Sequence, residues 1–344
     1  MYIKKNYTVR ETLFISGKHF SWIIPYVLLI AILYHYTALR EFSIPWLPLS
    51  IIGTAVAFYV GFKNNQAYDR LWEARMIWGG IVNSSRMWGS NIKAFVVETG
   101  AGENREEDLF QQKKAMIYRH IAWLYKLRKQ LLEPTAWEHL SLKGIYGRDA
   151  RQKMQKLGIG LYGEDVTDIE IRKYLSAAEY KALPAFKNAA AQMIDTQSQE
   201  LALLRKHGHV GHFEHVALQG ILNDFYDHQG KAERIKKTPF PRQFASFGFI
   251  MNCLFIIMLP FGFFSEFAKI GNYGIWLAVP FIIVISWVYV VMELVGDYSE
   301  NPFEGLSNDV PMLSICRNIE IDLLQQLGEP NLPEAVPSIN HVLL

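Results

Sequence analysis

The chain has 344 residues, of which 50% are hydrophobic, 14% aromatic and 20% charged, and its formal net charge is +2. So much apolar material excludes an intrinsically disordered protein, and a net charge near zero gives no reason to expect a nucleic-acid partner. The mean hydropathy of +0.05 averages over two very different parts of the chain. Asp, Glu, Lys and Arg are absent from four windows: residues 19–39, 42–62, 243–265 and 270–292.

The four uncharged windows predict four membrane-spanning helices, because a helix needs about 20 predominantly apolar residues to cross a bilayer. We place the spans at residues 22–39, 44–62, 247–264 and 273–292. Only residues 40–41 separate the charge-free parts of the first pair, and only residues 266–269 separate those of the second. We therefore expect each pair to form an antiparallel helical hairpin.

The distribution of lysine and arginine predicts the orientation. Basic residues cluster before span one, after span two and before span three, whereas the two short loops carry only Arg40 and Lys269. By the positive-inside rule, this predicts a multi-pass protein of the cell (inner or plasma) membrane with both termini cytoplasmic. The expected parts are a cytosolic N-terminal segment (1–20), transmembrane helices 1 and 2 (21–63), a cytosolic helical domain (64–241), transmembrane helices 3 and 4 (242–294) and a cytosolic C-terminal segment (295–344).

The cytosolic domain is predicted to be mostly helical, because apolar residues recur at helical spacing and strand signals are scarce. A Gly-rich loop is expected over residues 136–165. The expected helical stretches are residues 66–98, with Gly79 and Gly80 as the first breakers, and residues 115–132, 175–204, 216–226 and 311–327.

Span two has the pattern of a pore-lining helix. Past Gly61 it continues into polar sequence with no proline, which predicts one long helix that leaves the membrane. A stripe of small residues four apart (Gly53, Ala57, Gly61) would let a neighbouring helix approach closely. A second stripe, made of Thr54, Phe58 and Phe62, would form an apolar constriction if it faced a symmetry axis, and such constrictions gate ion flow by dewetting. The alternative is that Phe58 and Phe62 pack against spans one and four.

No span contains a charged residue, and pumps and ion-coupled carriers usually need intramembrane charges. This absence favours a passive pore or a simple anchor. Four helices are too few to enclose a wide path within one chain. A channel would therefore need a ring of identical subunits.

Several runs of residues resemble bacterial homologues of the bestrophin family. The resemblance extends from the first span to about residue 328, with the matching runs in the same order. The runs are GFKNNQAYDRLWEAR (61–75), WG (78–79), NSSR (83–86), ERIKKTPFP (233–241), LPF (259–261), NPFE (301–304), NDVPM (308–312) and ICRNIE (315–320).

The resemblance implies an all-α membrane protein that assembles as a homopentamer, with four transmembrane helices per subunit, a helical cytosolic domain and an axial pore. It implies that the family's hydrophobic neck falls on Thr54, Phe58 and Phe62. Thr54 is polar where the family usually has an aliphatic residue, so we expect Phe58 and Phe62 to form the main barrier. The implied partners are other copies of the chain, the lipid bilayer and small monovalent ions. Animal members conduct chloride and a type of bacterial homologue prefers cations, so the ion's sign stays open.

The resemblance implies two further sites. A second constriction in the cytosolic domain is placed near residues 207–213, with Val210 and His212 as candidates. Animal members bind calcium in a clasp after the fourth span. Asn301 and Asp309 match that clasp, but Leu306 stands where an acidic ligand is expected. We therefore expect no cofactor and no calcium activation.

Two further groups of polar residues have alternative interpretations. His207, His209, His212 and His215 are weak candidates for a metal site, because they lack the fixed spacing of known metal motifs. They leave open a membrane-anchored enzyme or a metal-binding protein, although no catalytic motif is present and we expect no enzyme. A ring of His212 would instead make conduction depend on pH. Asp69 and Glu73 would either concentrate cations in a vestibule or form ion pairs.

Overall fold

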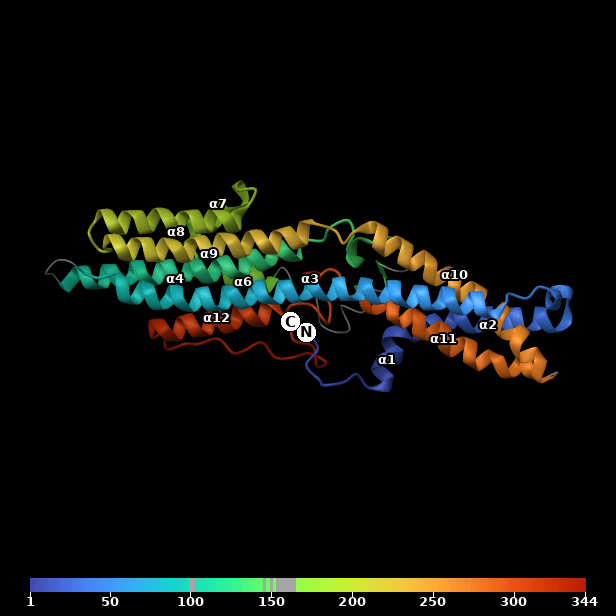
Figure 1. The fold of residues 1–344 in the computed structure, drawn as a ribbon. Helices are drawn as coiled ribbons and strands as arrows, with labels where there is room; N and C mark the ends of the chain where they lie inside the picture. The colour runs from blue at the N-terminus through green and yellow to red at the C-terminus, as the bar shows by residue number, and fades with distance from the viewer. Residues whose placement is uncertain (99–102, 145–146, 149–150, 153–164, 272) are drawn as a thin grey trace. The chain divides into compact units, whose positions relative to one another are not determined.

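The computed structural model describes residues 1–98, 103–144, 147–148, 151–152, 165–271 and 273–344. Within these residues the regular secondary structure is helical, apart from two isolated β-bridges that join Val342 to Tyr2 and to Ile339. The α-helices, labelled in Figure 1, are α1 (Val9–Ser16), α2 (Phe20–Tyr36), α3 (Trp46–Phe95), α4 (Glu103–Leu132), α6 (Asp165–Tyr174), α7 (Ala177–Ala182), α8 (Ala189–Lys206), α9 (His212–Lys237), α10 (Arg242–Phe267), α11 (Gly274–Asp297) and α12 (Met312–Leu327). Short 3₁₀ turns are η1 (Gly17–His19), η2 (Ala38–Glu41), η3 (His139–Ser141), η4 (Leu183–Ala185) and η5 (Ala268–Ile270).

The chain divides into two compact units. We call residues 4–70 and 239–300 the span unit, and residues 1–3, 71–238 and 301–344 the head unit. The span unit contains α1, α2, α10, α11 and the first half of α3. The head unit contains the second half of α3 and the other helices.

The span unit holds the apolar helices. Four helical stretches are long and apolar enough to cross a membrane: residues 9–36, 46–95, 242–270 and 274–297. Glycines bring α3 and α10 close together. A methyl group on Gly53 of α3 would lie 2.7 Å from the ring of Phe255, and one on Gly248 of α10 would lie 3.3 Å from Tyr59. The predicted close approach of a neighbouring helix is confirmed at Gly53.

Helix α3 is a single helix of 50 residues, and its continuation past Gly61 confirms the prediction. At 1.5 Å per residue it is about 75 Å long. Gly79 and Gly80 do not end it, because an isolated glycine costs a helix only about 1 kcal/mol and packing compensates for that cost. At Gly80 close packing requires a glycine, since a methyl group there would lie 2.4 Å from the ring of His228.

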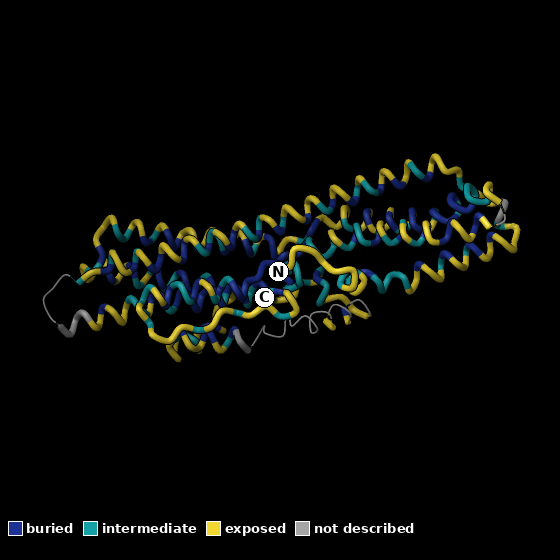
Figure 2. The backbone as a smooth tube through the Cα atoms, turned by 90° about the horizontal axis from the view of Figure 1, so that it is seen from below, coloured by how far each residue is buried: buried dark blue, intermediate teal, exposed yellow. Residues whose placement is uncertain are grey.

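Helix α4 lies in the core of the head unit. The predicted apolar positions Ile117, Ile121, Leu124, Leu127 and Leu131 are all buried, which confirms the helical pattern. The helix begins at Glu103, earlier than predicted, and ends at Leu132 as expected. Figure 2 shows buried and exposed positions alternating along the long helices, as expected for helices that each bury one face.

Two predicted helical boundaries in the head unit are wrong. The stretch 175–204 is broken into α7, η4 and α8, because Pro184 lacks an N–H to continue the helix and Asn188 starts a new one by capping Ala191. The short piece expected over 216–226 is part of the 26-residue helix α9, which forms a hairpin with α8 (Figure 1). Much of the expected loop 136–165 lies outside the described residues.

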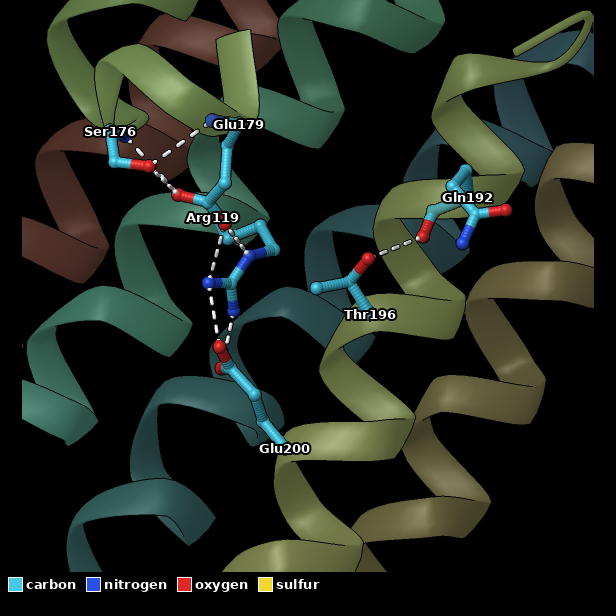
Figure 3. A network of polar contacts seen from close by, with 6 residues as sticks. All are labelled: Arg119, Ser176, Glu179, Gln192, Thr196 and Glu200. Atoms are coloured by element: carbon cyan, nitrogen blue, oxygen red, sulfur yellow. Dashed lines mark hydrogen bonds and ion pairs between the residues drawn. The ribbon is translucent and has the colours of Figure 1, made fainter. Parts of the chain in front are cut away.

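Arg119 joins three helices of the head unit. From α4, its Nε donates to Glu179 of α7 at 2.7 Å, and its Nη2 donates to Glu200 of α8 at 2.8 Å. Figure 3 shows the guanidinium between the two carboxylates, with Ser176 capping the first turn of α7 beside it. The same view shows Thr196 of α8 bonded to the carbonyl of Gln192, which is a contact within one helix.

Substituting Arg119→Met is expected to lower the free energy of unfolding by about 2 kcal/mol, because hydrogen bonds to charged groups contribute about 1.5–3 kcal/mol. The two carboxylates are about one-third exposed and regain water, which limits the loss. Thermal unfolding of the purified protein measures the change. Lys181→Met on the exposed face of α7 is the matched control, and equal effects of the two variants would contradict the role of Arg119.

Candidate functional site

Thr54, Phe58 and Phe62 lie on one face of α3, four residues apart. The side chains of Phe58 and Phe62 are 66% and 64% exposed, so α2 and α11 leave most of both rings uncovered. The interpretation that these rings pack against spans one and four is therefore wrong within the chain. Thr54 donates its hydroxyl proton to the carbonyl of Ser50 at 2.9 Å, so the stripe presents lone pairs and a methyl group at this position.

A shallow groove of about 500 Å³ runs beside this stripe. Tyr289 of α11 closes one side of it, and the Tyr289 hydroxyl donates to the carbonyl of Gly53 at 2.9 Å. At Gly61 the groove is open, since a methyl group there would meet no atom within 4 Å. The groove is lined by Thr54, Ala57, Phe58, Gly61, Phe62, Asn65 and Tyr289. Asn65 and Tyr289 were not predicted.

A buried ion pair fixes α3 to α11 immediately after the stripe. Lys63, which is 2% exposed, donates to the carboxylate of Glu293. The next residue, Asn64, donates its amide to the carbonyl of Met292 at 2.9 Å. Gly296 makes room for this contact, because a methyl group there would lie 2.2 Å from the Asn64 amide oxygen. The position of the aromatic stripe on α3 is thus set by polar contacts as well as by packing.

The two acidic vestibule candidates lie in different surroundings. Asp69 is exposed on α3. Glu73 forms an ion pair with Arg234 of α9, so its charge is already balanced within the head unit. The exposed face of α3 continues there through Trp72, Met76 and Gly79. Asp69 stays a vestibule candidate, whereas Glu73 fits the ion-pair interpretation.

The candidates for the cytosolic constriction also differ. Val210 is 3% exposed and belongs to the hydrophobic core of the head unit, so it is not available to line a passage. His212 is exposed at the first position of α9. Of the pair, only His212 is placed to face an open space, and the constriction itself stays a prediction.

The histidine-rich turn does not gather a metal site. Among the described residues, which include this whole turn, no group of three His, Cys, Asp or Glu side chains is placed to hold a metal ion. The rings of His207 and His209 are 6.4 Å apart, and the backbone of His209 accepts a hydrogen bond from Val97. Burial, together with the charges of Arg205 and His212, lowers the pKa of His215. The alternative function based on this cluster therefore has no support in the geometry.

The two residues that match the calcium clasp, Asn301 and Asp309, each take part in hydrogen bonds. Glu304 accepts hydrogen bonds from the Asn301 amide at 2.8 Å and from His139 at 2.9 Å. Asp309 accepts one from the backbone N–H of Leu306 at 2.9 Å. Calcium needs six to eight oxygen ligands, but here the carboxylates already serve internal donors and Leu306 supplies no side-chain oxygen. The absence of a calcium requirement stays a prediction.

Asp309 makes the stability of the head unit depend on pH. Its complete burial, followed by the charge of Glu304, raises the pKa of Asp309 from its usual value to about 7, although backbone N–H groups oppose the rise. A raised carboxyl pKa means that the folded state favours the protonated form. The stabilisation is therefore complete below the unfolded pKa near 4 and is lost as the pH rises through about 7.

We expect the contribution of Asp309 to the free energy of unfolding to be larger at pH 5.5 than at pH 8.5, by about 2 kcal/mol. Asp309→Asn should flatten this dependence, because the amide cannot ionise. Asp322→Asn, at a partly exposed carboxylate of α12, should keep the wild-type dependence. An Asp309→Asn protein that follows the wild-type pH profile would contradict this prediction.

Comparisons with known proteins agree along most of the chain. The model of the bacterial and fungal bestrophin family matches residues 4–325. The voltage-dependent anion channel-forming protein YneE of Escherichia coli K12 is 26% identical over 314 residues, which cover 88% of this chain and 87% of that protein. The protein of the same name from Salmonella typhimurium is 28% identical over 287 residues, which cover 83% of this chain and 78% of that protein. The crystal structure of a bacterial bestrophin homologue from Klebsiella pneumoniae has a TM-score of 0.73 at 17% identity, covering 92% of this chain and 99% of that one.

Together the apolar helices, the helical head unit and these matches define an all-helical membrane protein of the ion-channel class. The relatives are named as channel-forming proteins and not as enzymes. The chain belongs to the bacterial and fungal bestrophin family, which confirms the resemblance seen in the sequence.

Proposed function

We propose that this chain forms an anion channel in the cell membrane, in which five copies surround an axial pore lined by α3. The observation that carries the proposal is the pair of uncovered rings of Phe58 and Phe62 in a chain whose relatives are named anion channel-forming proteins. A helix face with two bare aromatic rings is stable only if it meets lipid, another protein or a dry constriction. In a neck shared by five subunits, these rings meet other protein chains and form a dry constriction.

The proposed gate is the apolar ring made by Phe58 and Phe62. Water leaves a narrow apolar constriction readily, and ions do not cross it without water. Thr54 adds hydroxyl oxygens at one end of this ring, which eases hydration there. Conduction is passive in this proposal, since the charge-free windows contain no Asp, Glu, Lys or Arg to couple ion flow to proton transfer.

Selectivity in this proposal comes from dehydration and neutral dipoles. The nearest basic residue to the neck, Lys63, is buried and balanced by Glu293, so it offers no positive ring to the pore. Asn65 lines the groove one turn further along, and its amide N–H groups can replace water around an anion. We expect no calcium requirement, both termini in the cytoplasm, and four spans per subunit.

The reversal potential in asymmetric NaCl tests this proposal. Purified protein in a planar bilayer should carry a current that reverses near the equilibrium potential of chloride and falls when gluconate replaces chloride. Reversal near the sodium potential would overturn the anion assignment while leaving a channel, and no current would overturn both. Native mass spectrometry should show five copies per complex, and any other number would contradict the proposed ring.

A further inference from the structure

Helix α1 is a short, well-formed helix that precedes the first span. Its eight residues begin with a capping box, in which the Thr8 hydroxyl accepts from the N–H of Glu11 and the Glu11 carboxylate accepts from the N–H of Thr8 at 2.7 Å. The turn η1 then leads into α2, and Figure 1 shows that α1 does not continue the direction of α2. Because α1 turns aside from α2, it presents a surface of its own.

Exposure differs along α1. Ser16, the last residue of the helix, is 2% exposed, and its hydroxyl accepts a hydrogen bond from the indole of Trp287 of α11 at 3.0 Å. The outer face presents Val9, Leu13 and Phe14, which are 78%, 45% and 47% exposed. Three large apolar side chains on a helix of eight residues make an apolar surface that water alone does not stabilise.

The length of α2 places α1 at the membrane boundary. The 17 residues of α2 rise about 26 Å, less than the 30 Å thickness of a typical hydrocarbon core. The beginning of α2 therefore lies close to one edge of the core, and α1 precedes it by only three residues. Trp22 is 43% exposed within the first turn of α2, at the depth where tryptophan is enriched in membrane proteins.

The charges around α1 complement an anionic surface. Residues 4–18 contain four basic side chains, Lys4, Lys5, Arg10 and Lys18, against one acidic side chain, Glu11. Arg10 lies between the apolar side chains on the outer face, where its aliphatic stem can follow them while its guanidinium reaches a phosphate. Such basic residues next to a span attract anionic lipids.

We propose that α1 is an interfacial helix that docks on the bilayer, with its apolar face at the boundary of the acyl chains and its basic residues on the headgroups of anionic phospholipids. Lipid is favoured over a second copy of the chain because α1 is continuous with a span and its surroundings are basic. The contact of Ser16 with Trp287 then links this lipid-bound helix directly to α11.

Nitroxide labels measure the depth of the outer face. Cysteine is placed singly at Leu13, at Phe14 or, as a water-exposed control, at Lys187, in a Cys253→Ala background reconstituted in lipid vesicles. Cys316 can stay, because it is fully buried and burial raises the pKa of its thiol to about 12. Labels at Leu13 and Phe14 should collide with oxygen more than with a water-soluble nickel complex, and the label at Lys187 should do the opposite. Labels at Leu13 and Phe14 that favour nickel would overturn the proposal, as would labels shielded from both by another protein surface.

Lipid selectivity tests the basic residues separately. A variant that combines Lys4→Gln, Lys5→Gln, Arg10→Gln and Lys18→Gln is compared with the wild type in vesicles of phosphatidylcholine and phosphatidylglycerol at 3:1. Spin-labelled phosphatidylglycerol should associate several-fold more strongly than phosphatidylcholine with the wild type. That preference should fall close to one in the variant and in about 1 M salt. A control with Lys181→Gln, Lys187→Gln, Arg205→Gln and Lys206→Gln, all in the head unit, should keep the preference. A variant with undiminished preference would overturn the proposed role of the basic residues.

Discussion

Replacing Phe58 by alanine is expected to raise the basal conductance of the channel strongly. The change removes an exposed aromatic ring from every subunit at the proposed neck, so the constriction widens and holds water more easily. If this ring of side chains contributes about 1.4 kcal/mol to the barrier, the conductance rises about tenfold. Single-channel recording in a planar bilayer measures it.

The matched control for this prediction is Phe249→Ala. Phe249 is also mostly exposed, but it lies on α10 and does not line the groove beside the stripe, so the same chemical change should leave conductance near the wild-type value. Phe62→Ala should resemble Phe58→Ala, and Thr54→Ile should lower the current by drying the end of the neck. Equal conductance in the Phe58→Ala and Phe249→Ala proteins would remove Phe58 from the gate.

Breaking the pair of Lys63 and Glu293 is expected to have the largest effect on stability. Lys63→Met leaves the Glu293 carboxylate buried without its counter-charge, which typically costs about 3–5 kcal/mol. The double variant Lys63→Met with Glu293→Met should recover most of that loss, because two apolar side chains need no partner. Thermal unfolding in detergent, followed by tryptophan fluorescence, measures the stability of the wild type, the single variant and the double variant.

An exposed ion pair provides the comparison. Arg86 pairs with Asp322 at 2.8 Å, but the Arg86 side chain is 54% exposed, and such pairs usually contribute less than about 1 kcal/mol. Arg86→Met should therefore change the unfolding temperature little. A Lys63→Met protein as stable as the Arg86→Met protein would show that the pair is not important for stability, and a double variant no better than Lys63→Met would show that the cost does not come from the unpaired charge.

The sequence alone was sufficient for the long apolar helices and for the continuity of α3, because absence of charge and helical periodicity are local signals. The same periodicity identified the buried face of α4, from Ile117 to Leu131. The ends of helices were harder to predict from the sequence. The helix expected over 175–204 is broken near Pro184. Helix α9 begins at His212, earlier than expected, because the turn before it is rich in glycine and histidine and gives weak local signals.

The stripe of Thr54, Phe58 and Phe62 could be recognised from spacing, but its exposure could not, since exposure depends on where α10 and α11 pack. Contacts between residues far apart in the sequence could not be predicted either. Examples are the ion pair of Glu73 with Arg234, the hydrogen bond of Glu304 with His139, and the packing of Val210 in the core. One contact of this kind, the ion pair of Lys63 with Glu293, could have been recognised from the sequence. Lys63 and Glu293 are the first charged residues after the second and fourth uncharged windows, which end on the same side of a four-helix arrangement.

Gly61 lowers the stability of helix α3, and no packing contact within the described chain compensates for this cost. Glycine inside a helix is about 1 kcal/mol less favourable than alanine, and at most helix positions close packing justifies it, as the ring of Phe255 does at Gly53. At Gly61 no atom of the described chain lies within 4 Å of the missing methyl group. The same is true of Gly79. Judged only by its own fold, the exposed face of α3 is therefore a suboptimal helix, and alanine at either position should make the isolated subunit more stable.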